Sequence, residues 1–142
     1  MKTIRHILQL KGYDIWCITS TDTVFNALKL MANKDVGALL VMEKDRLLGI
    51  ISERDYARKV ILVGKSSKET LVSEIMTTEI FTIHPDQTVE ECLDLMTEKH
   101  IRHAPVIEDD KVIGVVSIGD VVRDIIYNQK KTIKNFGERI LT

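Results

Sequence analysis

Gly114-Val115-Val116-Ser117-Ile118-Gly119-Asp120 is the stretch that decides the fold, because the chain contains its counterpart as Gly49-Ile50-Ile51-Ser52-Glu53-Arg54-Asp55. In both copies, two β-branched residues lead from a glycine into Ser-x-x-Asp, and the copies lie 65 residues apart. The same offset holds without a gap when residues 15–61 are aligned with residues 80–126, with 16 identities over 47 positions. The chain therefore contains an internal duplication.

The Ser-x-x-Asp motif has two interpretations. In the first, the serine caps the following helix and accepts a hydrogen bond from its first turn, while the aspartate faces the helix dipole. In the second, the unpaired amides at the helix start bind a phosphate, and Asp55 or Asp120 accepts hydrogen bonds from both hydroxyls of a ribose. Gly49 and Gly114 would then let a ligand approach the backbone closely. The two interpretations are compatible, because a ligand can bind to the same groups that cap the helix.

Composition places the chain among soluble globular proteins. It has 142 residues, of which 44% are hydrophobic and 29% charged, with a net charge of −1. This balance argues against a general polyanion binder, so we expect no nucleic-acid partner. No apolar run reaches the roughly 18 residues of a membrane span, and the N-terminal ten residues lack a signal-peptide core. We therefore expect a cytoplasmic protein without a membrane partner.

The cysteines and histidines give no sign of a metal site. Cys17 and Cys92 are far apart, and neither has a cysteine at its repeat-equivalent position. We interpret both as small buried hydrophobic residues. The four histidines show no zinc-type spacing, so we expect no metal.

Each repeat is expected to fold as β-α-β-β-α. Short strands at 16–19 and 81–84 lead into helices whose apolar residues recur at i, i+3, i+4 and i+7, starting from Val24 and Val89. Paired strands follow at 38–42 with 47–51 and at 104–107 with 112–116, and the last helix of each repeat begins at Ser-x-x-Asp. The fold class is therefore α+β.

The repeats set the expected domain boundaries. Residues 3–8 resemble residues 71–76 at an offset of 68, so each repeat has a short lead-in helix. We expect residues 1–63 to form the first repeat with its N-terminal lead-in helix, and 64–69 to form a polar linker. Residues 70–142 then form the second repeat with a C-terminal helical tail. The linker contains Gly64-Lys65-Ser66, but Lys59 stands where a phosphate loop needs its first glycine, so a P-loop is excluded.

A duplicated β-α-β-β-α unit whose last strand runs into Gly-h-h-Ser-x-x-Asp resembles a tandem pair of CBS domains, also called a Bateman module. The resemblance covers nearly the whole chain. It extends to Asp22-Thr23-Val24 with Gln87-Thr88-Val89, and to the segment 36–41 with 101–106. It implies two repeats packed about a pseudo-twofold axis with two related clefts between them, and modules that pair into a homodimer through their helices.

The resemblance also implies a ligand, namely an adenosine-containing molecule such as AMP, ADP, ATP, S-adenosylmethionine or NAD. Ser52 and Ser117 would face the ribose or first phosphate, and Asp55 and Asp120 would hold the ribose hydroxyls. The remaining residues of the implied clefts line the adenine or flank the phosphate: Ile15, Trp16, Ile80, Phe81, Arg54, Arg58, Arg102, His103, Pro105, Ile118 and Gly119.

Charged residues near the motif differ between the repeats. Arg102 and His103 form either a solvated strand end or a phosphate contact, and the first repeat has glycine and alanine at those positions. Arg54 and Arg58 are spaced i, i+4 in the first repeat. The two sites are therefore expected to be unequal, with the second the better candidate.

Three functions remain in competition. The leading one is a non-catalytic regulatory module for signal transduction, which binds an adenine nucleotide and acts through an unknown effector protein. A structural or oligomerisation module with unoccupied clefts is the alternative, in which Ser-x-x-Asp serves only as a cap. A nucleotide-processing enzyme is the weakest, because no nucleophile with a neighbouring base and no carboxylate cluster is grouped in the sequence.

Overall fold

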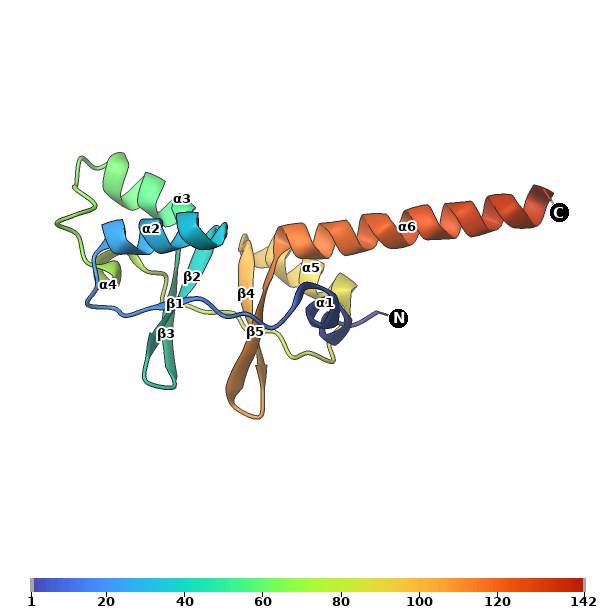
Figure 1. Cartoon of the computed structure of the whole chain (residues 1–142), viewed down its shortest axis with the longest axis horizontal. Coiled ribbons are helices and arrows are strands. Elements are labelled where there is room, and N and C mark those ends of the chain that lie inside the picture. The colour runs from blue at the N-terminus through green and yellow to red at the C-terminus, as the bar shows by residue number, and fades with distance from the viewer. Residues whose placement is uncertain (1, 142) are drawn as a thin grey trace. The chain divides into compact units, whose positions relative to one another are not determined.

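The computed structural model describes residues 2–141 and divides them into two compact α+β units (Figure 1). The first-repeat unit comprises residues 14–81, and the second-repeat unit comprises residues 2–13 together with 82–141. In the described chain, no helix combines the length and the apolar character that a membrane crossing requires.

The first-repeat unit is built around a three-stranded sheet. Its elements are β1 (Cys17–Ile18), α2 (Val24–Lys34), β2 (Ala38–Glu43), β3 (Arg46–Ser52), α3 (Glu53–Tyr56), the π-helical turn η1 (Ala57–Ile61) and α4 (Val72–Ile75). β1 pairs with β2 in parallel and β2 with β3 antiparallel. The expected order is thus present, although the last helix continues as a π turn.

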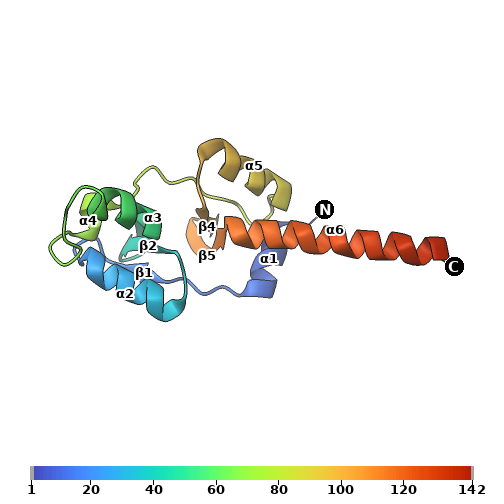
Figure 2. The ribbon, with the colours of Figure 1, turned by 90° about the horizontal axis from the view of Figure 1, so that it is seen from above.

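The second-repeat unit repeats this plan with a two-stranded sheet. Its elements are α1 (Ile4–Lys11), α5 (Val89–Lys99), β4 (His103–Glu108), β5 (Lys111–Ser117) and α6 (Ile118–Leu141). β4 and β5 pair antiparallel. α6 has 24 residues and includes the expected helical tail, as Figures 1 and 2 show in orange and red.

The strand expected at 81–84 is reduced to one bridge, between Ile83 and Val106. In the first repeat, the amide of Leu40 donates to the carbonyl of Trp16 at 3.1 Å. The equivalent residue in β4 is Pro105, which has no amide hydrogen. The bond that would extend the ladder towards residue 81 therefore cannot form.

The central helices begin and end where equivalent residues place them. The hydroxyls of Thr23 and Thr88 cap α2 and α5, each accepting from a backbone amide at 3.1 Å. Both helices end at a left-handed residue, Asp35 with φ 54° and His100 with φ 55°. The helix lengths are therefore equal.

The two lead-in helices are exchanged between the repeats. α1 precedes the first repeat in the chain, yet it packs into the core of the second-repeat unit, where Ile4 and Leu8 are fully buried. Figures 1 and 2 both show α1, in dark blue, beside the first turns of α6. In the same way, α4 precedes the second repeat and packs into the first-repeat unit through Val72 and Ile75.

This exchange differs from the expected boundaries of 1–63 and 70–142. An offset in sequence shows that two segments are equivalent, but it does not show which repeat each segment covers. The linker 64–69 also belongs to the first-repeat unit, because the carbonyl of Ser67 accepts from the amide of Phe25 at 3.0 Å. The compact units are therefore 14–81, and 2–13 with 82–141.

Candidate functional site

In the second-repeat unit, the Asp120 carboxylate forms a capping box with Ser117 at the start of α6. The Ser117 amide donates to Asp120 Oδ2 at 2.8 Å, and the Asp120 amide donates to Ser117 Oγ at 3.1 Å. Two cations complete the carboxylate's contacts: Lys11 Nζ lies 2.7 Å from Oδ2, and Arg123 Nη2 lies 2.8 Å from Oδ1. The Asp120 side chain is only 9% exposed, so its orientation is fixed from several sides.

The first-repeat unit has the same cap with different partners. The amide and hydroxyl of Ser52 each donate to Asp55 Oδ2 at 3.0 Å, and the Asp55 amide donates to Ser52 Oγ at 3.2 Å. Lys59 Nζ lies 3.0 Å from Asp55 Oδ1, and the Thr77 hydroxyl donates to the same oxygen at 3.5 Å. Both aspartates are therefore capping residues, as the first interpretation of the motif predicts.

Electrostatics keep the Asp120 carboxyl ionised. Burial raises the pKa of Asp120, but the hydrogen bonds from Lys11 and Ser117 outweigh burial, and the pKa lies below its ordinary value. The nearby His103 behaves in the opposite sense: burial lowers its pKa and outweighs the attraction of the Asp120 charge. The site therefore presents an anionic carboxylate beside a neutral imidazole at pH 7.

The other predicted residues of the second repeat lie at different depths around this cap. His103 pairs with Ser117 across the two strands, and the Ile118 amide donates to the carbonyl of Arg102 at 2.8 Å. The Arg102 side chain is exposed, whereas Pro105 is buried in the sheet. Gly119 lies in the first turn of α6, with Ile118. The structure thus brings Arg102, His103, Ile118 and Gly119 to the cap and leaves Pro105 as a core residue.

The predicted residues Ile15, Trp16, Ile80 and Phe81 all belong to the first-repeat unit and are half-buried. Trp16 packs against its hydrophobic core, and Lys34 Nζ lies 4.3 Å from the centroid of its ring. Their assignment to an adenine pocket stays a prediction.

Arg54 and Arg58 do not share a regular α-helical face. Arg54 lies in α3 and Arg58 in the π turn η1, so the helix changes type between them. Both side chains are exposed. Lys59, four positions after Asp55, contacts the Asp55 carboxylate.

The motif glycines make room for the lead-in segments. A Cβ atom on Gly114 would lie 2.8 Å from Leu8 Cδ2, and one on Gly49 would lie 2.8 Å from the carbonyl oxygen of Thr77. Leu8 lies in the exchanged lead-in helix α1, and Thr77 lies shortly after the exchanged lead-in helix α4. The expectation that these glycines admit a ligand is therefore corrected: the space beside them is filled by the chain itself.

A groove of about 280 Å³ runs between α1 and α6 next to the Asp120 cap. Its charged lining residues alternate along two helix faces with apolar ones. The charged and apolar residues that line the groove are Ile7, Leu10, Lys11, Asp120, Arg123, Asp124 and Tyr127. The cap thus opens onto a partly apolar groove within the second-repeat unit.

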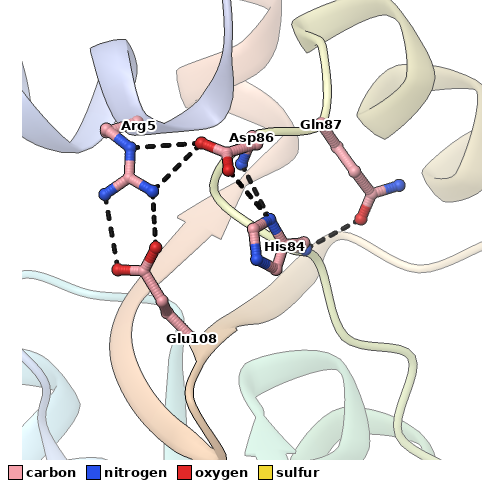
Figure 3. Close-up of polar contacts among 5 residues, drawn as sticks. All are labelled: Arg5, His84, Asp86, Gln87 and Glu108. Atoms are coloured by element: carbon pink, nitrogen blue, oxygen red, sulfur yellow. Dashed lines mark hydrogen bonds and ion pairs between the residues drawn. The ribbon is translucent and has the colours of Figure 1, made fainter.

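A second charged cluster fixes α1 at its other end (Figure 3). His84, Asp86 and Glu108 bring possible metal-ligating atoms within 4.8 Å of one another, a grouping that the sequence did not suggest. The Arg5 guanidinium lies among them and donates to Asp86 Oδ1 at 3.0 Å and to Glu108 Oε2 at 2.5 Å. A cation from the protein already pairs with both carboxylates, so the cluster is explained as an anchor for α1.

Sequence reasoning missed the lysines that contact the two carboxylates. Lys59 was detectable, because it stands four residues after Asp55 on the same helical segment. Lys11 carried no such signal, because its contact with Asp120 joins residues 109 positions apart.

Comparisons with known proteins agree with this architecture. The CBS-domain family model matches residues 9–62 and 72–127. The mitochondrial CBS domain-containing protein CBSX3 of Arabidopsis thaliana is 43% identical over 148 residues, covering 97% of this chain and 71% of the relative.

Two solved structures share the fold. A protein with CBS domains from Burkholderia ambifaria, assigned to signal transduction, superposes with a TM-score of 0.87 at 48% identity, covering 90% of this chain and 96% of its own. The hexameric CBS-CP12 protein of bloom-forming cyanobacteria has a TM-score of 0.76 at 30% identity, covering 86% and 70%. The family is generally regulatory, and the expected α+β fold of tandem repeats is confirmed. The chain belongs to the CBS-domain family and consists of two CBS domains in tandem.

Proposed function

We propose that this chain is a non-catalytic regulatory module that binds an adenosine-containing ligand, such as AMP, ADP, ATP or NAD, at its Ser-x-x-Asp caps. One observation carries the proposal: each repeat holds an aspartate in a fixed orientation at the first turn of a helix, with a cation beside it. An oriented carboxylate accepts from ribose hydroxyls, and the helix start and the cations favour a phosphate. Pre-oriented groups also lower the entropic cost of binding.

The thiols support a non-catalytic role. Burial raises the pKa of Cys92 to about 11, and partial desolvation raises the pKa of Cys17, which is exposed and not buried as expected. A reactive cysteine requires a lowered pKa, so neither is an activated nucleophile. We therefore propose that the output is a change in packing or in contacts with an effector protein.

A specific observation favours the scaffold alternative, because the bonds of both capping boxes join groups of the chain itself. In this alternative, Asp55 and Asp120 contribute only to stability. Each N-cap interaction is worth about 1 kcal/mol, so substitution would lower the melting temperature under either hypothesis. Stability alone does not separate the two.

A thermal-melt series separates them. The purified chain is melted with AMP, ADP, ATP, NAD or S-adenosylmethionine, with GMP as the control. Binding to the folded state stabilises it by about 2.7 kcal/mol at a hundredfold excess over the dissociation constant. We expect an adenosine compound to raise the melting temperature, and Asp120→Asn to reduce that rise. If none of the five compounds shifts the melt, the scaffold function replaces the sensor.

We also propose that the chain forms a homodimer through α6. Val122, Ile126 and Ile133 recur at helical spacing and are 38%, 45% and 71% exposed. Exposed apolar residues on one helix face mark an interaction surface, and the cyanobacterial relative is hexameric. Light scattering coupled to size-exclusion chromatography gives the mass directly, and a monomer at micromolar concentration would refute the proposal.

A further inference from the structure

Lys11 occupies a place in the second-repeat unit that a backbone amide fills in the first. The amide of Thr77 donates to the carbonyl of Ile50 at 2.8 Å. The repeat-equivalent carbonyl, that of Val115, instead accepts from Lys11 Nζ at 2.9 Å, and the same ammonium reaches Asp120. A cation thus replaces a neutral donor at one of two otherwise equivalent positions.

The length of the lead-in explains the difference. The offset between the repeats changes from 68 in the lead-in segments to 65 after them, so the N-terminal lead-in is three residues longer. α1 consequently has eight residues where α4 has four, and it ends at Lys11 before Gly12, whose φ is 102°. Ile4 and Leu8 are fully buried, so α1 is a firm support for the lysine at its end.

The two units also place their lysines differently. Lys59 contacts Asp55 from the same helical segment and donates its other bond to the carbonyl of Ile75 at 2.9 Å. Its counterpart in the second repeat is Asp124, which is buried. In the second-repeat unit, the lysine that contacts the cap is thus Lys11 of the exchanged helix α1, which also bonds to β5, the strand before the cap.

We propose that Lys11 makes the Asp120 site selective for nucleosides that carry a phosphate, a role that rests on the proposed adenosine binding. A ribose that bonds to Asp120 displaces Arg123 first, because that side chain is 74% exposed and such contacts are weak. Lys11 keeps its bond to the carbonyl of Val115 and remains beside the ligand. An ammonium has three donors, so its third N–H is available to a phosphate oxygen.

The test compares AMP with adenosine by isothermal titration calorimetry on the full chain. An Asp55→Asn background silences the first site and keeps an acceptor for its cap. Lys11→Met and Lys11→Gln both remove the charge, Lys11→Arg retains it, and Lys130→Met removes an exposed charge further along α6 as the matched control.

We expect both neutral variants to lose about tenfold in AMP affinity, equivalent to about 1.4 kcal/mol, with adenosine affinity unchanged. Lys11→Arg should retain most of the preference for AMP, and Lys130→Met should match the parent protein. The inference is overturned if both neutral variants keep the parent's ratio of AMP affinity to adenosine affinity, whether both affinities fall equally or neither changes. Adenosine binding would still be established. If no adenosine compound binds the unsubstituted chain, the proposed function itself is refuted.

Discussion

Leu8→Ala tests the exchange of the lead-in helices. Leu8 stands before the first repeat in the chain but is fully buried in the core of the second-repeat unit. Removing a fully buried leucine side chain costs about 2 to 5 kcal/mol, depending on how far the cavity collapses. We therefore expect the second-repeat unit to open more often, by a factor of roughly 30 or more at 1.4 kcal/mol per tenfold.

Native-state hydrogen exchange with peptide resolution is the appropriate assay, because it locates opening within the chain. Leu8→Ala should accelerate exchange in α5 and β4, with a smaller effect on α2 and β2. Ile75→Ala is the matched control, since Ile75 is 2% exposed and packs in the first-repeat core. It should accelerate exchange in α2 and β2 instead. The reasoning is refuted if Leu8→Ala loosens α2 and β2 more than α5 and β4.

Three further predictions concern the two motif glycines and the half-buried His103. Gly49→Ala should destabilise the chain by about 1 to 3 kcal/mol in urea unfolding, because the new Cβ meets a backbone carbonyl at 2.8 Å. In Gly114→Ala the new Cβ meets the Leu8 side chain instead, so adding Leu8→Val should partly restore stability. If the destabilisations of the two single variants simply add in the double variant, this explanation is contradicted. The pKa of His103 is lower in the folded state, so the unfolded chain takes up a proton first as the pH falls below about 6.5, and stability declines there. His103→Asn should flatten melting temperatures between pH 7.5 and 5.5; an unchanged slope would mean that another group controls it.

Local signals predicted most of the fold. The offset of 65 placed the helices, because Thr23 and Thr88 cap them at equivalent positions. It also placed the strand pairs, whose registers match across the repeats. These features depend on neighbouring residues or on short hairpins, which a periodic pattern records.

Features that depend on distant contacts could not be predicted in this way. The third strand of the second sheet was expected from the repeat, and a single residue without an amide hydrogen, Pro105, limits it to one bridge. The Asp120 site was found from its motif, but Lys11 approaches it from 109 residues away. Sequence periodicity identifies the carboxylate and not the cation that contacts it.

The exchanged lead-ins give the proposed sensor a physical route for its output. The chain passes from one unit to the other after Tyr13 and after Phe81, so each cap lies beside a segment that leads into the other repeat. Lys11 contacts Asp120, and Thr77 contacts Asp55, next to these crossings. A ligand shifts a conformational equilibrium only through unequal affinity for its states. Because a ribose on Asp55 would compete with the Thr77 hydroxyl, occupancy of that cap would change the restraint on the segment that continues past Phe81 into the second-repeat unit.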